Sequence, residues 1–416
     1  MRWLALPLGL LVLAALAYAL WPRPSMSVTG GLDAAAVAAA LANLDADLDA
    51  DLDAGRMPAV AATRAATSEP MAFPQDHGAH PEAGAELWEL NALLQDEDGQ
   101  RVAVRLSLAR LDLIQGLQQR SSALAAHSLF AADLAVAAGG ELKSVALREQ
   151  RLSRAALELA GAGTDEAGVE RVWVEQWALS RPTEGVLRLR AEANGVDLEL
   201  ELSSLKPPVV LDLQTSAGSA PQSQSAPSRF YSQTRLAVSG SLRTDGIEHQ
   251  LQGLGWFDHG WGALSEALSG GRGQLVANRF QLQLDDGSEL ACFHLRRRRG
   301  GGTAIPSCVL IDAAGEQRGL QRRDLTLAPT DAGWVTEGGV SYPFEWRLLI
   351  PSQGIELEIR PLFDDLASGV TTLAWTQGGQ LWRGAVELRG RRGTERIGGQ
   401  GRMDLNGYAE GKLVGT

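Results

Sequence analysis

The sequence predicts an all-β protein with two antiparallel domains, and three observations support that prediction. Apolar and polar residues alternate, with the period of half-buried strands, in two pairs of segments: 186–191 with 196–202, and 280–284 with 289–295. Asn194-Gly195 and Asp286-Gly287 lie between the members of these pairs, and both dipeptides are strong hairpin signals. The 416 residues allow two domains, and the 47 glycines fit many short strands better than helical bundles, where each interior glycine costs about 1 kcal/mol.

The composition and motifs exclude several function classes. A net charge of −12 argues against nucleic-acid partners, which need a basic surface, and against adsorption to anionic lipid by charge alone. The chain has no G-x-S-x-G elbow and no glycine-rich dinucleotide loop between a strand and a helix. We therefore expect neither serine-hydrolase nor nucleotide chemistry, and no cofactor.

The first 20 residues predict export. Arg2 precedes an uncharged apolar run over residues 4–20, and Ala17-Tyr18-Ala19 has the small-x-small pattern of a signal-peptidase site. The run is long for a signal peptide and just long enough to span a bilayer, so residues 1–20 are either a cleaved signal peptide or a membrane anchor. Both alternatives deliver the rest of the chain to the periplasm or the extracytoplasmic face of the inner membrane, and the anchor would also hold it at that membrane.

The region that follows predicts a spacer and then two domains. Residues 21–70 are of low complexity, with leucine at every fourth position among aspartates over 44–52, which indicates a partly helical, acidic spacer. A calcium loop would need a central glycine and a final glutamate, and both are absent. A stretch rich in Ser, Pro, Gln and Ala at 214–228 marks a linker or a long loop. We therefore expect an N-terminal domain at 71–227 and a C-terminal domain at 228–416.

The two cysteines favour a disulfide. Cys292 and Cys308 lie in separate alternating segments joined by a glycine-rich connection. If that hairpin is centred on Gly300, the two residues stand opposite each other, where Cβ atoms are about 4.5–5.5 Å apart and a disulfide is within reach. The alternative is a pair of free thiols in the core.

An ordered set of short motifs resembles the AttH-like and carotenoid 1,2-hydratase-like lipocalin family, over about residues 73–410. The motifs are FPQDHGAHP at 73–81, ELW at 86–88, VWVEQW at 172–177, YSQTRL at 231–236, WFDHGWG at 256–262, LQLDDG at 282–287, YPFEW at 342–346 and DLNGY at 404–408.

The resemblance implies two lipocalin-like (calycin) antiparallel barrels in tandem. Some members of the family are companions of ABC transport systems that handle lipid or lipoprotein-like cargo, and others are hydratases that add water to a carbon–carbon double bond of a carotenoid. The chain departs from the family pattern at Leu87-Trp88, Asn278-Arg279-Phe280 and Trp382-Arg383-Gly384, where aromatic or acidic residues are lost. These changes weaken the expectation of an enzyme more than the expectation of the fold.

The cluster Asp258-His259-Gly260-Trp261 carries the candidate chemistry. Adding water to an alkene needs an acid and a group that stabilises the resulting cation. Asp258 or Asp286, with a pKa raised by an apolar cavity, would be the acid, His259 its partner and Trp261 the stabiliser. The alternative is a structural corner in which these side chains satisfy buried backbone groups and fill the barrel.

A second polar cluster, Asp76-His77-Gly78-Ala79-His80, offers two histidines and a carboxylate. A zinc site needs three or four ligands, and the chain has only six histidines, so we expect a hydrogen-bonded plug at a barrel mouth and no metal site. We expect the two clusters to lie together. The expected ligand-binding residues are Asp76, His77, Trp88, Trp256, Trp261, Tyr342 and Trp346.

Three function classes remain, and the first is favoured. It is a non-catalytic binder of a hydrophobic small molecule or lipid, working beside an inner-membrane ABC transport system. The motivating observations are the membrane-proximal N-terminus, the barrel fold and the 11 tryptophans, which suit an apolar pocket. The second is a hydratase or isomerase acting on a polyene, and the third is a structural subunit with filled barrels.

Overall fold

The structure is a computed structural model, and it is almost entirely β. It describes residues 70–112, 128–140, 142, 147–210, 229–262, 275–297, 305–320, 322–330, 333–336, 339–364, 369–371 and 381–408. Helical structure within these ranges consists of short 3-10 turns such as η1 (Gln75–His77), and no helix there is long and apolar enough to cross a membrane. The expected signal or anchor at 1–20 and most of the spacer at 21–70 lie outside the described residues.

The first antiparallel sheet has the strand order β4-β3-β2-β1-β12-β11-β9-β8-β7-β6-β5, with β10 paired to β11. Its strands are β1 (Ala85–Gln95), β2 (Arg101–Asp112), β3 (Ser128–Ala138), β4 (Leu147–Arg154), β5 (Ala160–Thr164), β6 (Glu170–Val174), β7 (Trp177–Thr183), β8 (Val186–Ala193), β9 (Val196–Ser204), β10 (Val209–Val210), β11 (Arg229–Thr244) and β12 (Ile247–Trp261).

The second antiparallel sheet has the order β16-β15-β14-β13-β24-β23-β21-β20-β17, with β22 paired to β23. Its strands are β13 (Leu275–Leu284), β14 (Glu289–Arg297), β15 (Ile305–Ile311), β16 (Gln317–Leu320), β17 (Thr326–Pro329), β20 (Trp346–Ile350), β21 (Ile355–Pro361), β22 (Val370–Thr371), β23 (Leu381–Arg392) and β24 (Glu395–Leu405). A separate small ribbon pairs β18 (Trp334–Val335) with β19 (Ser341–Tyr342).

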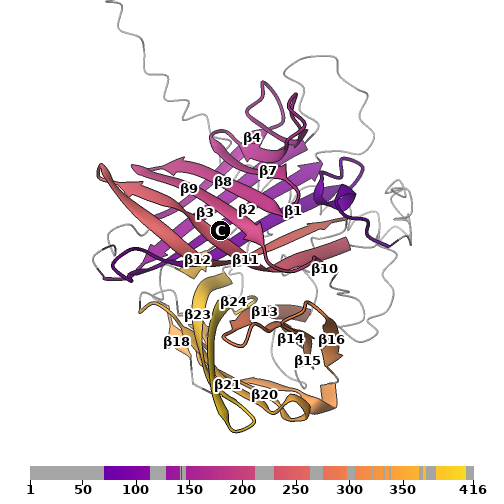
Figure 1. Cartoon of the computed structure of the whole chain (residues 1–416), viewed down its shortest axis with the longest axis vertical. Helices are drawn as coiled ribbons and strands as arrows, with labels where there is room; N and C mark the ends of the chain where they lie inside the picture. Colours follow the sequence, from indigo (N-terminus) through magenta and orange to yellow (C-terminus); the bar gives the residue numbers. More distant parts are fainter. Residues whose placement is uncertain are drawn as a thin grey trace, which may run out of the picture.

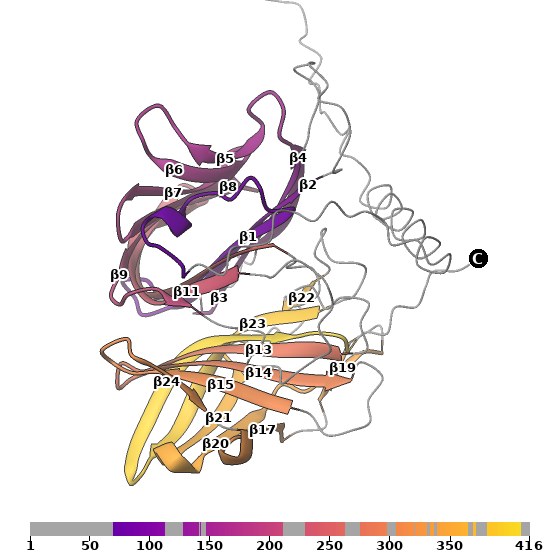
Figure 2. The ribbon, with the colours of Figure 1, turned by 90° about the vertical axis from the view of Figure 1, so that its right-hand side faces the viewer.

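Each large sheet curls around its own core, and the two lie one above the other (Figures 1 and 2). Residues of β1, β2, β3 and β12 in the first barrel and of β13, β23 and β24 in the second line the same cavity, so these strands face one another. The expected fold class, two antiparallel barrels of lipocalin type in tandem, is confirmed.

The division between the barrels differs from the expected boundary at 227/228. Strands β11 and β12 belong to the first sheet, so the chain passes from one barrel to the other between Trp261 and Leu275. The polar stretch at 214–228 joins β10 to β11 within one sheet and is not a link between domains. Its composition indicates a connection but carries no information about which sheet the next strand joins.

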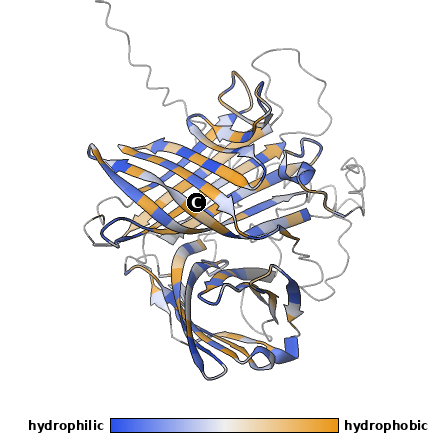
Figure 3. Cartoon of the chain, in the orientation of Figure 1, coloured by the Kyte–Doolittle hydropathy of each residue, from blue (hydrophilic) through white to orange (hydrophobic). Residues whose placement is uncertain are grey.

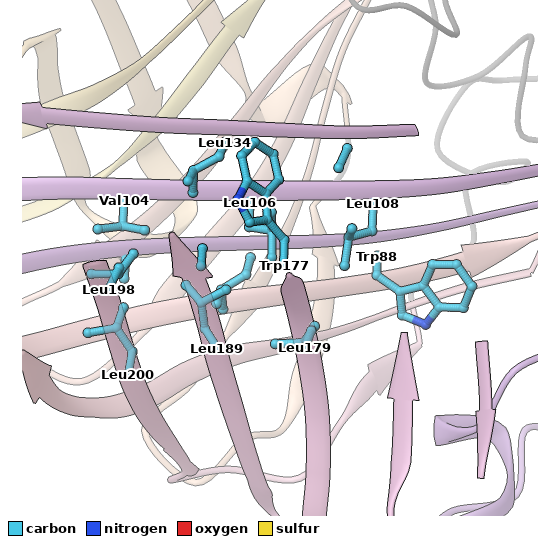
Figure 4. Close-up of a cluster of buried hydrophobic side chains, with 14 of the residues drawn as sticks. Trp88, Val104, Leu106, Leu108, Leu134, Trp177, Leu179, Leu189, Leu198 and Leu200 are labelled. Atoms are coloured by element: carbon cyan, nitrogen blue, oxygen red, sulfur yellow. The ribbon is translucent and has the colours of Figure 1, made fainter. Parts of the chain in front are cut away.

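The alternation of apolar and polar residues in the sequence matches an alternation of buried and exposed residues along the strands. In β8 and β9 buried and exposed residues follow one another, and the strands join through Asn194-Gly195, where both residues have positive φ (48° and 81°) as a tight hairpin requires. Hydrophobic and hydrophilic positions alternate along many strands in Figure 3. The inward side chains, among them Trp177, Leu106 and Leu134, fill the first barrel (Figure 4).

The predicted disulfide is present. Cys292 on β14 and Cys308 on β15 are directly opposed in the strand register, with Cα atoms 4.1 Å apart, and their sulfurs are bonded. The bond lies in the second core, where both residues are almost fully buried.

Candidate functional site

Strand β12 separates the residues that the sequence suggested as one catalytic set. Consecutive strand residues point to opposite faces, so His259 and Trp261 point into the first barrel whereas Asp258 points toward the second. Asp286 lies elsewhere, in the turn between β13 and β14, where it caps Ser288 and pairs with Arg392. The expected combination of Asp258 or Asp286 with His259 and Trp261 therefore does not form, although β12 joins two buried polar sites.

The first site lies inside the first barrel and is called the first-barrel cluster. It consists of Asp76, His77, His80, Glu86, Tyr231, His259 and Trp261. Nδ1 of His77 is 2.7 Å from the hydroxyl of Tyr231, and the His80 ring stacks on Trp261 with centroids 3.6 Å apart. The two expected polar segments, 76–80 and 258–261, thus meet through His80, His259 and Trp261, without Asp258.

Glu86 is the centre of this cluster. Its Oε1 accepts hydrogen bonds from Nδ1 of His80 at 3.0 Å and Nε2 of His259 at 2.9 Å, and the His80 backbone N–H donates to it as well. The guanidinium of Arg110 lies 3.3 Å from Oε2. Burial acts to raise the pKa of Glu86, but the hydrogen bonds from His259 and His80 and the charge of Arg110 outweigh it and lower the pKa to about 2. The carboxylate is therefore ionised at neutral pH.

The two buried histidines of the cluster are held neutral. Burial, with the nearby charge of Arg181, lowers the pKa of His77 to about 3. Burial also lowers the pKa of His259. Since ionised Glu86 can only accept, His259 donates from Nε2, and its Nδ1 is then an acceptor without a hydrogen-bond partner among the described residues.

The same residues can alternatively be interpreted as a metal site. One donor atom each from His80, Glu86 and His259 lie within 4.8 Å of one another, and imidazole and carboxylate are zinc ligands. A cation there would face the guanidinium of Arg110, 3.3 Å from Glu86, and would replace two hydrogen bonds that already satisfy the carboxylate. We therefore interpret the group as a hydrogen-bonded cluster.

A small pocket adjoins the first-barrel cluster. It has a volume of about 30 Å³, and its lining includes His77, Trp88, Glu170 and Arg181. That volume is enough to hold a water molecule. Burial raises the pKa of Glu170 despite the opposing charge of Arg181, so this carboxyl is more readily protonated than a free glutamate.

The second site lies between the barrels. Asp258 accepts hydrogen bonds from Arg279 at 2.7 Å, Trp256 Nε1 at 2.8 Å and Ser232. Burial raises its pKa, although Arg279 acts in the opposite direction. One strand away, Glu89 binds Arg279 at 2.8 Å and also contacts Arg383 of the second barrel. Buried ion pairs thus connect the two barrels.

A cavity of about 240 Å³ lies beside these ion pairs. Small side chains of β2 and β3, including Ala103, Ala135 and Ala137, form one side of it, and Gly384 and Gly401 of the second barrel lie on the other. Trp256, which the sequence suggested as a ligand-binding residue, is part of the lining. This volume is eight times that of the pocket in the first barrel.

Other expected ligand-binding residues fall in different places. Trp88 lines the 30 Å³ pocket and stacks on His259. Tyr342 and Trp346 belong to the core of the second barrel, where Trp346 packs edge-on against Phe280. They lie in neither the first-barrel cluster nor the lining of the inter-barrel cavity.

Comparison with known proteins identifies the family. The model of the AttH-like family matches residues 64–408, most of the chain. The chain belongs to the AttH-like family. The sequence has no match among curated proteins.

Two solved structures share the fold of this AttH-like protein. An AttH from Nitrosomonas europaea has 24% identity and a TM-score of 0.65, over 83% of this chain and 99% of the other. Kievitone hydratase from Nectria haematococca has 15% identity and a TM-score of 0.54, over 83% of this chain and 95% of the other. At these identities the comparison shows a common fold and leaves activity open.

Several residues of the two sites in this AttH-like chain were missed from the sequence. Glu86 and Tyr231 were seen only as parts of motifs, and Glu170 and Arg181 carried no signal. The alternation of β1 could have indicated Glu86, because it shares a face with Trp88 and pairs with Trp261 in the register. The inter-barrel arginines come from strands far apart in sequence and had no local signal.

Proposed function

We propose that the protein binds a small, largely apolar molecule in the cavity between its barrels. The observation that carries the proposal is the size and lining of that cavity, about 240 Å³ against 30 Å³ for the pocket in the first barrel. An apolar cavity of about 150 Å³ can hold benzene, so a cavity of about 240 Å³ has room for a larger molecule. The first barrel is filled by its own side chains, so we place the binding site at the interface between the barrels.

Two matched variants test this assignment. Ala135→Phe places a large side chain in the inter-barrel cavity, and Ala162→Phe places the same one in the 30 Å³ pocket. Protein purified from its own cell envelope should carry an apolar molecule, detected by mass spectrometry, in the wild type and in Ala162→Phe but not in Ala135→Phe. If Ala135→Phe retained the bound molecule and Ala162→Phe lost it, the binding site would be assigned to the pocket in the first barrel. Absence of a bound molecule from all three proteins would refute the proposal.

We propose the periplasm, or the outer face of the inner membrane, as the location. The Cys292–Cys308 bond supports it, because disulfides persist in oxidising compartments. As partner we propose an inner-membrane ABC transport system, on the resemblance of the sequence motifs to companions of such systems. Crosslinking in intact envelopes followed by mass spectrometry tests the partner, and recovery of no transporter subunit would contradict it.

A hydratase is the second candidate, and one observation favours it. Glu170, whose pKa is raised by burial, shares the small pocket with the indole of Trp88. The carboxyl would donate its proton to one alkene carbon, the cation would form beside Trp88, and water would add to the other carbon and return a proton to Glu170. A pocket of about 30 Å³ is small for a polyene, which is why we place binding first. Addition of one water to a supplied polyene by the wild type, and not by Glu170→Gln, would reverse this order.

A further inference from the structure

Two groups of buried ion pairs border the inter-barrel cavity, and a hydrogen bond from Arg105 to the main-chain oxygen of Arg383 joins them. Asp133 holds Arg105 and Arg148, and Glu89 holds Arg383 and Arg279. The members of the two groups are Arg105, Arg148, Arg279, Arg383, Arg402, Glu89, Asp133, Asp258 and Asp404.

The positive groups face the cavity. Four of the five arginines line it, and no acidic side chain is found among its described lining residues. Burial raises the pKa of Asp258 and of Asp404 in spite of the arginines around them, and protonation of either would leave those arginines with less negative charge beside them. A buried excess charge is costly unless a counter-charge accompanies it.

Polar atoms on the cavity residues also lack hydrogen-bond partners among the described residues. Nε of Arg105 and Nη1 of Arg402 are buried donors of this kind, and both residues are more than nine-tenths buried. Nδ2 of Asn91 is a third donor, and Oε1 of Gln281 is an acceptor that a hydroxyl or a water could satisfy. The unpartnered groups are thus mainly donors, and two of them are cationic.

The rest of the lining is largely apolar. Trp256 and Trp382 lie on it together with Phe363, and the alanines of β2 and β3 add small apolar surfaces. A molecule that satisfies both parts of this lining has an apolar body and one negatively charged head that accepts hydrogen bonds.

We propose that the natural ligand is a medium-chain carboxylic acid, bound as its carboxylate beside Arg105 and Arg402. This inference rests on the proposed function and adds the chemical class of the ligand to it. Arginine is the side chain best suited to a carboxylate, because its planar donors match the two oxygens. A carboxylate takes a single charge out of water, whereas a phosphate monoester would take about two and so cost more to bury.

The test compares three probes with the same eight-carbon tail. Binding of octanoate, 1-octanol and octyl phosphate to the wild-type protein is measured at pH 7 by isothermal titration calorimetry. Octanoate should bind about tenfold or more tightly than 1-octanol, because charge-assisted hydrogen bonds are worth more than neutral ones. Equal affinities of octanoate and 1-octanol, or tighter binding of octyl phosphate, would overturn the head-group assignment. Failure of all three probes to bind would instead count against the proposed function.

Conservative variants separate recognition from packing. Arg105→Lys and Arg402→Lys keep the positive charge beside Asp133 and Asp404 but remove the free guanidinium donors. Each should weaken octanoate several-fold and leave 1-octanol unchanged. Arg188→Lys, at an exposed ion pair with Glu201, is the matched control and should change neither. Unchanged octanoate binding in both cavity variants would refute the role of these arginines. If a variant does not fold, it binds no probe, and the three probes on the wild type still decide the proposal.

Discussion

Replacing Glu86 by glutamine tests the interpretation of the first-barrel cluster. The folded protein holds the pKa of Glu86 at about 2, against 4.5 for the free side chain. One pKa unit corresponds to about 1.4 kcal/mol, so the ionised carboxylate contributes about 3 kcal/mol to folding at neutral pH. Glutamine has the same shape without the charge, and its amide nitrogen adds a donor where His80 and His259 already donate. We therefore expect Glu86→Gln to lose about 3 kcal/mol of unfolding free energy at pH 7.

The pH dependence of that loss gives an independent check. Because the folded pKa is lowered, the contribution of Glu86 is complete above pH 4.5 and is lost as the pH falls toward 2. Urea unfolding of wild type and Glu86→Gln should differ by about 3 kcal/mol at pH 7, and the difference should shrink between pH 4.5 and pH 2. Glu201→Gln, at an exposed ion pair with Arg188, is the control and should lose less than about 1 kcal/mol. A loss below 1 kcal/mol for Glu86→Gln, or a difference independent of pH, would refute the central role of this carboxylate.

Three further predictions concern the scaffold. Replacing Cys292 and Cys308 by serine opens a crosslink of sequence separation 16 and should lower the unfolding free energy by about 3 kcal/mol in urea. The wild-type protein, denatured without reductant, should show no free thiol, and two titratable thiols would contradict the bond. Gly401→Ala should destabilise the second barrel by more than about 1 kcal/mol in thermal melts, because the added Cβ would lie 2.2 Å from the Gln281 carbonyl oxygen. Gly319→Ala is the control: its Cβ would meet nothing within 4 Å, so the same melts should show no change. Trp177→Ala removes a fully buried ring from the first core and should cost about 3–5 kcal/mol in urea unfolding, and a loss under 1 kcal/mol would show that this core is loosely packed.

Local features of the fold could be predicted because their signals are local. The β8–β9 hairpin follows from alternation around Asn194-Gly195, and the disulfide follows from the symmetry of the β14–β15 hairpin around Gly300. The boundary between barrels could not be placed, because strand composition does not specify a partner. β12 pairs with β1, which lies about 160 residues earlier in the chain, while its neighbour β11 pairs with β9.

The candidate site could be predicted in part. The period of two along β12 implies that Asp258 and His259 face opposite sides, so their separation could be predicted from the sequence once the strand was recognised. The inter-barrel cavity could not be predicted from the sequence. Arg105 donates a hydrogen bond to the main-chain oxygen of Arg383, 278 positions away, and only the packing of the two barrels brings such pairs together.

The position of β12 in a wall shared by the two sites limits how the protein can change. Trp88 and His259 face the first barrel, whereas Glu89 and Asp258 on the same two strands face the second. Substitutions can therefore alter one site while sparing the other. Inserting or deleting one residue within β12 would exchange the two faces of that strand, bringing Asp258 into the barrel and the imidazole of His259 against the arginines. Lineages that diverge in ligand or activity should accordingly differ here by substitution, with changes of length confined to the connecting loops.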